Sequence, residues 1–286
     1  MPTLPDASIG SLYIVATPIG NREDVSMRAI KTLQTVDLIL AEDTRHSKQL
    51  LSALGIHTPI QSFHTHNESQ KSNWFLGLLQ QGQHLALISD AGTPLISDPG
   101  YPLVQLAHHH HIPVIPIPGP CALIAALSAA GVPCSSFTFV GFLPAKSSQR
   151  QQKLQAISTM NHTLVCYEST HRIIESLQDI ALILGNDCPL VLAKELTKSF
   201  ERIISGTPTS LLTWLASDSA HVKGEFVIII PPRNTSAAAT DDSDRILPIL
   251  LAELPLKQAV TIACQLTGLQ KNELYAKAIQ LKKPRH

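Results

Sequence analysis

The sequence predicts an α/β protein built from two α/β domains, and three observations support this fold class. Short apolar runs alternate with amphipathic segments from Ser11 to Pro232, which is typical of strands alternating with helices. The chain has 286 residues, a length that suggests two domains. Polar or glycine-containing turns directly follow several apolar runs, as they do at the carboxyl ends of parallel strands.

The first half is expected to form a parallel sheet with helices packed on it. Strands, some running into a turn, are predicted at 11–20, 37–43, 84–89 and 112–119, and helices at 24–36, 44–56, 66–82 and 101–111. Ligands of such sheets bind outside the carboxyl ends of the strands. Gly20, Asp43, Asp90 and Gly119 all fall at those ends, so we expect one site there.

The second half is also expected to be α/β, after an alanine-rich helix at 120–133. Strands are predicted at 135–146, 162–169, 189–196, 201–206 and 225–232, with helices at 150–158, 170–185 and 208–217. A polar stretch of small residues then reads as a linker, and short helices follow it. The predicted domains are therefore an amino-terminal α/β domain (1–118), a second α/β domain (119–232), a linker (233–244) and a small basic helical region (245–286).

Composition favours a globular cytoplasmic enzyme. Hydrophobic residues make up 44% and charged residues 15%, and no apolar stretch reaches the roughly 18–20 residues of a transmembrane helix. The five cysteines are scattered without CxxC spacing, so neither a disulfide framework nor a metal site is expected. The formal net charge is zero, which gives no global attraction to nucleic acid. The end of the chain is basic, and it is either a solvated face or a phosphate-facing tail.

The stretch "SDAGTPLISDPG" (89–100) follows the apolar run Leu85–Ile88. Its glycines permit unusual backbone angles and its prolines fix φ, so the loop is stiff and lined with acceptors. We expect it to hold a ligand. The turn "ATPIGN" (16–21) matches no nucleotide-binding glycine loop, since it has one glycine and no lysine.

Three further polar segments carry candidate functional side chains. In "AEDTRHS" (41–47), Asp43 or Thr44 either caps a helix or belongs to a polar rim from which Arg45 reaches a phosphate. "CYESTHR" (166–172) and "AKELTKSFE" (193–201) place carboxylates beside basic residues after apolar strands. They form either salt-bridged surface loops or an acid/base group at the domain junction. The histidines of "HTHNES" fit helix capping or substrate hydrogen bonding better than metal ligation, and those of "HHHH" fit the end of a helix.

An ordered set of motifs resembles one family. The motifs are "VATPIGN", "EDTRHS", "HNE", "SDAGTPLISDPGYPLV", "IPGPCALIAALSAAG", "FVGFLP", "YESTHR", "KELTKSFE" and "KGEF", from about Ser11 to Ile230. Together they resemble the ribosomal RNA small subunit methyltransferase I proteins, a branch of the tetrapyrrole methylase superfamily. The segment "LTGLQKNELYAKAI" resembles the end of that family.

The resemblance implies methyl transfer from S-adenosylmethionine to a ribose 2′-hydroxyl of a cytidine in 16S rRNA of the small subunit. It also implies a homodimer and a cofactor cleft between two α/β domains. No membrane partner is expected, because no apolar stretch is long enough to span one. The cofactor residues that it implies are Pro18, Ile19, Asp90, Ala91, Gly92, Thr93, Pro94, Ile96, Pro118, Gly119, Cys121, Ala122, Leu123, Tyr167 and Ala193.

Catalysis requires alignment of oxygen, methyl and sulfur, and removal of the hydroxyl proton. We expect Glu168 or Glu195 to be the base and Lys194 or Lys198 to steady the developing alkoxide. RNA contacts are expected from Arg45, Lys146, Arg150, Lys271, Lys277, Lys282 and Lys283. Two alternatives stay open, namely a methylase of a tetrapyrrole precursor and a non-catalytic RNA-binding protein. The turn "ATPIGN" differs from the superfamily's glycine-rich first loop and counts against the tetrapyrrole reading.

Overall fold

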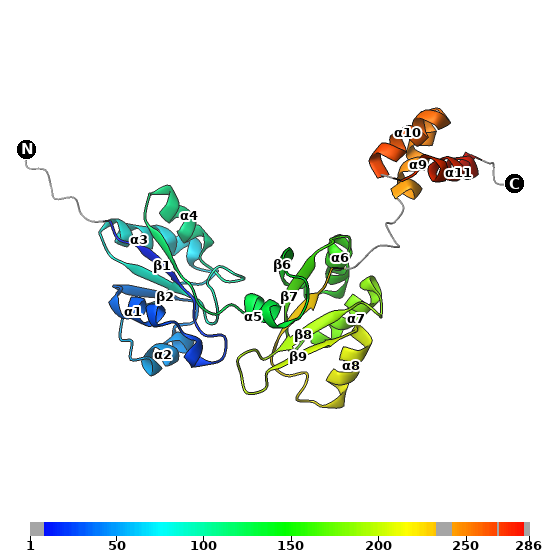
Figure 1. Cartoon of the computed structure of the whole chain (residues 1–286). Coiled ribbons are helices and arrows are strands. Elements are labelled where there is room, and N and C mark those ends of the chain that lie inside the picture. Colours follow the sequence, from blue (N-terminus) through cyan, green and yellow to red (C-terminus); the bar gives the residue numbers. More distant parts are fainter. Residues whose placement is uncertain (1–8, 233–241, 268, 283–286) are drawn as a thin grey trace, which may run out of the picture. The chain divides into compact units, whose positions relative to one another are not determined.

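The computed structural model of the chain describes residues 9–232, 242–267 and 269–282. The chain divides into two compact units, Met1–Pro232 and Arg233–His286 (Figure 1). The first unit contains two sheets, each of five strands. The second unit contains helices, and each unit has a hydrophobic core of its own.

The first sheet is parallel throughout, as expected from the sequence. Its strands are β1 (Leu12–Val15), β2 (Leu38–Ala41), β3 (Ile60–Ser62), β4 (Leu85–Ile88) and β5 (Val114–Ile117), in the order β3-β2-β4-β1-β5. Helices α3 (Glu68–Gln80) and α4 (Tyr101–His109) pack on one face, and α1 (Met27–Thr35) and α2 (Thr44–Ala53) pack on the other. The sequence analysis missed β3, a three-residue edge strand too short to show a pattern.

Local capping explains where the helices on this sheet begin. The Ser26 hydroxyl accepts a hydrogen bond from the backbone N–H of Ala29, and a short 3₁₀ helix, η1 (Arg22–Asp24), precedes this cap. The Asp43 carboxylate accepts from the backbone N–H groups of Arg45 (2.8 Å) and His46 (3.4 Å) at the start of α2. Asp43 is therefore a helix cap, one of the two roles considered for it.

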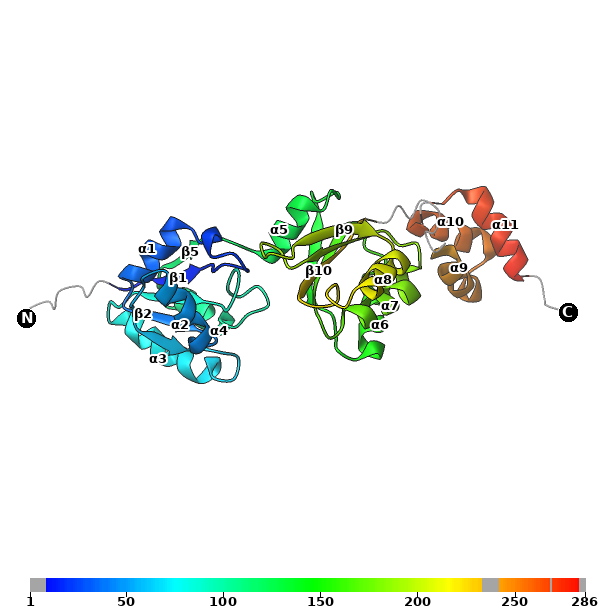
Figure 2. The same cartoon turned by 90° about the horizontal axis from the view of Figure 1, so that it is seen from below.

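The second sheet is mixed. Its strands are β6 (Phe137–Phe142), β7 (Thr163–Ser169), β8 (Leu190–Lys194), β9 (Arg202–Gly206) and β10 (Glu225–Ile230), in the order β6-β7-β10-β8-β9. Only the β6–β7 pair among them is parallel. Helix α5 (Ala122–Ala129) packs on one face, while α6 (Ser147–Ile157), α7 (Ile173–Leu184) and α8 (Pro208–Ser217) cover the other (Figure 2).

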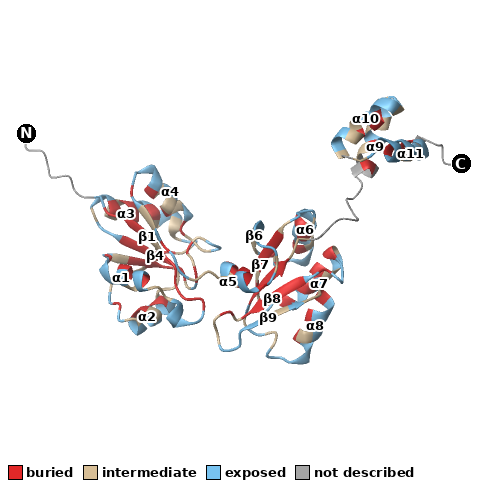
Figure 3. Ribbon diagram, viewed as in Figure 1, coloured by how far each residue is buried: buried red, intermediate tan, exposed pale blue. Residues whose placement is uncertain are grey.

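Arg150 lies inside this second domain, so its predicted contact with RNA is wrong. Its side chain is 1% exposed, and its Nε donates to the Asp179 carboxylate at 2.6 Å. It also donates to the carbonyls of Pro144 and Ala145, both at 3.2 Å. Arg150 shares the buried face of α6 with Leu154 and Ile157. The strands β7 and β8 of the same domain are largely buried as well (Figure 3).

The second unit is a three-helix bundle in its described part. Helices α9 (Asp242–Glu253), α10 (Leu256–Thr267) and α11 (Lys271–Lys282) bury Leu247, Val260, Ala263, Leu274 and Ala278 between them. Among the residues that the structure describes, no helix is long and apolar enough to cross a membrane.

Candidate functional site

The loop after β4 is held by hydrogen bonds from several directions. Thr17 and Gly92 exchange two backbone hydrogen bonds of 2.9 and 3.0 Å, which join the loop to the turn after β1. The Thr93 hydroxyl donates to the carbonyl of Pro120 at 3.0 Å. At the end of the loop, the backbone N–H of Gly100 donates to the Glu68 carboxylate at 2.9 Å. The stiffness that glycine and proline predicted therefore has a tertiary origin as well.

The same loop carries unusual backbone angles. Gly92 has a φ of +81°, which glycine adopts without steric cost. Leu95 and Ser97 also have positive φ, at 71° and 73°, although they carry side chains. Such conformations cost free energy and persist only where the surrounding contacts impose them. They direct the chain so that Ile96, Ser97 and Asp98 all border a cavity.

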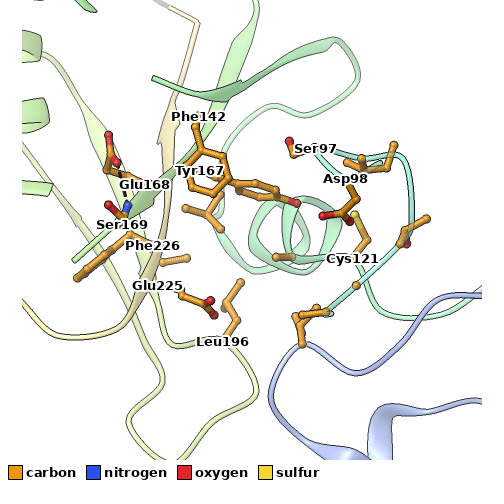
Figure 4. Close-up of a pocket in the computed structure, with 18 of the residues that line it drawn as sticks. Ser97, Asp98, Cys121, Phe142, Tyr167, Glu168, Ser169, Leu196, Glu225 and Phe226 are labelled. Atoms are coloured by element: carbon orange, nitrogen blue, oxygen red, sulfur yellow. Dashed lines mark hydrogen bonds between the residues drawn. The ribbon is translucent and has the colours of Figure 1, made fainter. Parts of the chain in front are cut away.

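This first cavity has a volume of about 300 Å³ and lies within the first unit, between the two sheets. Its apolar wall includes Ile19, Phe142, Tyr167, Leu196 and Phe226. Carboxylates border it as well, from the loop after β4 and from β7 and β10 (Figure 4). A mostly apolar cavity with a few converging polar groups is typical of a small-molecule site.

Most residues predicted to bind a cofactor lie in the wall of this cavity. They are Ile19, Asp90, Ala91, Gly92, Thr93, Ile96, Cys121, Ala122, Tyr167 and Ala193. Pro18 borders a neighbouring second cavity instead. Pro94, Pro118, Gly119 and Leu123 belong to neither wall.

Two of these outer residues support the wall. A Cβ atom on Gly119 would lie 3.0 Å from the Cβ of Ala16, so glycine lets the segment after β5 pass close to β1. The backbone N–H of Leu123 donates to the Tyr167 hydroxyl at 3.1 Å, which joins the start of α5 to β7. Burial raises the pKa of the Tyr167 hydroxyl, so this phenol stays protonated at neutral pH.

Glu168 is buried in the cavity wall, and both of its oxygens are engaged. Its Oε1 accepts from the backbone N–H of Ser169 at 2.8 Å and contacts Arg172 Nε at 3.1 Å. Its Oε2 accepts from the Ser176 hydroxyl at 2.6 Å. This network fixes the carboxylate, so its geometry suits positioning of the wall better than proton transfer.

The other three predicted catalytic residues lie at the end of β8 (Lys194) and in the loop that follows it (Glu195 and Lys198). Lys194 is 5% exposed and borders neither cavity. Lys198 donates to the carboxylates of Glu195 (2.7 Å) and Glu225 (2.8 Å). Burial opposes the charge of Lys198, but these hydrogen bonds outweigh it and raise its pKa above the ordinary value. Lys198 therefore stays an ammonium, at the border of the second cavity.

Asp98 is a site residue that the sequence analysis missed. It points towards the Tyr167 hydroxyl across the cavity (Figure 4). Burial, together with the charges of Glu42 and Asp90, raises the pKa of Asp98 to about 6, although the Ser89 hydroxyl opposes the shift. Burial and the Asp90 charge also raise the pKa of Glu42, against the effect of His64. Three carboxyl groups thus gather where the strands β2 and β4 end.

Other missed wall residues are Ser97, Phe142, Ser169, Leu196, Glu225, Phe226 and Val227. Most lie within motifs quoted in the sequence analysis, so their position beside predicted site residues could have identified them. What was lacking was the pairing of β10 with both β7 and β8, which places Phe226 between Glu168 and Lys194, and Glu225 beside Ser169.

Two of the residues predicted to contact RNA are exposed in the first unit. Arg45 is exposed and contacts Asp43 at 3.4 Å, and Lys146 is exposed at the start of α6. In the second unit, Lys271 is exposed at the start of α11, and Lys277 lies half-buried on the same helix. The Lys282 side chain and Lys283 lie outside the described residues.

Comparison with known proteins first defines the class. Residues 11–212 match the family model described as tetrapyrrole (corrin/porphyrin) methylases. A diphthine synthase structure has a TM-score of 0.62 at 12% identity and covers 78% of this chain and 90% of that one. A uroporphyrin-III C-methyltransferase from Thermus thermophilus, complexed with S-adenosylhomocysteine, has a TM-score of 0.52 at 19% identity and covers 78% and 97%. These likenesses show the fold, which is that of the tetrapyrrole methylase class.

Sequence relatives then define the family. The protein named ribosomal RNA small subunit methyltransferase I in Escherichia coli O157:H7 is 49% identical, over 96% of each chain. The protein of that name in Pseudomonas aeruginosa is also 49% identical, over 96% of this chain and 98% of its own. Residues 237–282 match the model described as the RsmI C-terminal HTH domain. The chain belongs to the ribosomal RNA small subunit methyltransferase I family, which confirms the resemblance inferred from the motifs.

Proposed function

We propose that this protein transfers a methyl group from S-adenosylmethionine to the ribose 2′-hydroxyl of a cytidine in the 16S rRNA of the small ribosomal subunit. The chain belongs to the ribosomal RNA small subunit methyltransferase I family, and S-adenosylmethionine is its methyl donor. The observation that carries the proposal is the 49% identity to such enzymes over nearly the whole chain. The nucleotide and the atom that is methylated come from the family resemblance.

The residues that line the first cavity suit this cofactor in polarity and charge. S-adenosylmethionine carries positive charges on its sulfonium and its ammonium, and it supplies an electrophilic methyl group when bound. The wall combines the apolar side chains of Ile19, Leu196 and Phe226 with the carboxylates of Asp90 and Asp98. Apolar surface suits an adenosyl group, and the carboxylates suit the cationic end. Thr93 and Tyr167 add hydroxyl groups to the wall.

The protein must orient the ribose hydroxyl and accept its proton. Orientation of reacting groups is worth about 7–11 kcal/mol, and a general base contributes about 10²–10⁴-fold. We assign the steadying of the alkoxide to Lys198, which Glu195 and Glu225 hold in place. We add Glu225 as a candidate base. Its Oε2 accepts a hydrogen bond from Lys198, but its side chain is 78% exposed and borders both cavities, whereas the side chains of Glu168 and Glu195 are largely buried.

The sequence resemblance also supports a homodimer in the cytoplasm, and both remain proposals. A methyltransferase that acts on RNA is consistent with the division of the chain into two units. The first unit contains the cavities, and the second matches the model of an HTH domain. The tetrapyrrole alternative loses its support, because the relatives that are 49% identical are named for ribosomal RNA. The tetrapyrrole enzymes share the fold at under 20% identity.

The test is transfer of labelled methyl from S-adenosylmethionine to small ribosomal subunits that lack the modification. Free 16S rRNA and a porphyrin precursor are assayed in parallel. We expect label in the RNA, on a ribose, resistant to alkaline hydrolysis at the modified position. Label on a base, or only on the porphyrin precursor, would contradict the proposal.

A further inference from the structure

A second cavity of about 320 Å³ adjoins the first. Four residues border both, namely Ile19, Asp90, Ala91 and Glu225. Its volume is at the lower end of the range of about 300–1,000 Å³ that is usual for ligand pockets. A group bound in one cavity can therefore meet a group bound in the other at this shared wall.

The two cavities differ in chemistry. The first has a wall rich in aromatic and aliphatic side chains. The second is bordered by the nitrogen-bearing side chains of Arg22, His46, Gln49 and Lys198. These come from three separate segments, which are η1, α2 and the loop after β8. Guanidinium and ammonium groups are the usual partners of a phosphate, and amide or imidazole groups suit a base or a sugar hydroxyl.

Close contacts between the two domains hold the second cavity in shape. A Cβ atom on Gly20 would lie 2.5 Å from the Lys198 Cγ, so glycine is needed for the lysine stem to lie against the turn after β1. The backbone N–H of Asn21 donates to the Thr197 hydroxyl at 3.1 Å. Thr197 and Glu195 have positive φ values of 66° and 49°, which are strained for residues with side chains.

Lys198 is oriented by two carboxylates and still has donor capacity. An ammonium carries three N–H groups, and the structure directs two of them at Glu195 and Glu225. Among the described residues, these are the hydrogen bonds that its Nζ makes, so a third donor remains for a ligand. Arg22, in η1, is exposed and borders the same cavity.

We propose that the second cavity binds the target nucleotide of the RNA, with its phosphate at Arg22 and its ribose hydroxyl directed at the shared wall near Lys198. This inference rests on the proposed function. A single nucleotide fits the cavity because it brings one phosphate charge together with a neutral sugar and base. The carboxylates of Asp90 and Glu225 disfavour a free, multiply charged anion at the same place. A duplex cannot enter, so the nucleotide must be turned out of its stack, as other enzymes require of their target nucleotides.

Two variants of the full-length protein test this placement. Gln49→Trp puts a large side chain into the second cavity from an exposed position on α2. Gln105→Trp makes the same change at an exposed position of α4 and serves as its control. Arg22→Ala removes the proposed phosphate contact, and its control is Lys31→Ala, an exposed cation of α1 in the same domain. The substrate is small ribosomal subunits that lack the modification, and the second readout is the Kd for S-adenosylhomocysteine.

We expect Gln49→Trp to lower kcat/KM for the subunits by about 100-fold or more. We expect Arg22→Ala to raise KM about tenfold and to reduce the slope of log affinity against log salt by about 0.7–0.9, the value for one phosphate contact on a single strand or duplex. Both variants should keep the Kd for S-adenosylhomocysteine within about twofold, since the cofactor lies in the other cavity. Both controls should behave like the unmodified protein.

Two results would overturn the inference while leaving the proposed function standing. One is normal kinetics of Gln49→Trp and Arg22→Ala with subunits that the unmodified protein methylates. The other is a tenfold or larger loss of S-adenosylhomocysteine affinity in Gln49→Trp, which would assign the second cavity to the cofactor. Absence of labelled ribose with the unmodified protein would instead refute the proposed function itself.

Discussion

Asp98 illustrates how a single carboxylate gains its chemistry from its surroundings. It stands within a loop that was predicted from the sequence to hold a ligand, yet nothing in the pattern of residues favoured it over Asp90. Only the backbone angles of Leu95 and Ser97 direct it into the cavity, next to the charges of Glu42 and Asp90. Asp90, by contrast, accepts a hydrogen bond from the backbone N–H of Asp43 at 3.0 Å.

The pKa of Asp98, raised to about 6, predicts pH-dependent cofactor binding. Below pH 6 the carboxyl is neutral, and above pH 6 it becomes an anion that attracts the positive charges of S-adenosylmethionine. Affinity should therefore rise roughly tenfold between pH 5 and 7.5, as measured by calorimetry. Asp98→Asn should remove this rise.

5′-Methylthioadenosine, which lacks both positive charges, is the matched ligand control, and its affinity should change little over this pH range. Asp187→Asn, an exposed aspartate of the second domain, is the control variant. A wild-type affinity for S-adenosylmethionine that is flat with pH would refute the role of Asp98.

At the scale of elements, the sequence predicted the helices and most strands, because their apolar periodicity is local. The mixed pairing of the second sheet was not predictable, since β10 joins β7 to β8 across long stretches of chain. The misassignment of Arg150 had a local signal that was not used. Arg150, Leu154 and Ile157 recur at helical spacing, so the arginine lies on the apolar face of α6.

Arg150→Ala should lower the free energy of unfolding by about 3–5 kcal/mol, because it leaves the Asp179 carboxylate buried without its partner. Urea unfolding at pH 7 measures this change. The double variant Arg150→Met with Asp179→Leu should recover much of the loss, since it removes both charges together. Under native conditions the salt dependence of RNA binding should not change. A normal stability combined with a smaller salt slope would restore Arg150 as an RNA contact.

At the scale of the whole molecule, the chain separates the cavities from the basic helices. The first unit contains both cavities, and the second has a core formed by its own three helices. The sequence predicted this division from the polar linker and from the excess of Lys and Arg near the end. It could not assign the lysines to positions on a helix, which requires the packing of Leu274 and Ala278 in the core.

Lys271 and Lys277, on α11, should contribute to RNA affinity without affecting the cofactor. Replacing both by Ala should reduce the slope of log affinity against log salt by about 0.7–0.9 for each phosphate contact that is lost. Titration of RNA binding at several salt concentrations measures this slope, with Lys31→Ala as the control. An unchanged slope would contradict phosphate contacts by these two lysines.

The narrow wall between the two cavities has a consequence for how such an enzyme diversifies. Ile19, Asp90, Ala91 and Glu225 face both compartments, whereas Arg22, His46 and Gln49 face only the second. Under the proposed assignment of the cavities to the methyl donor and the acceptor, substitutions in the latter group would change the acceptor and leave the donor site intact. The acceptor site and the donor site can thus evolve at separate rates within one fold. Only substitutions at the four shared positions would affect both sites.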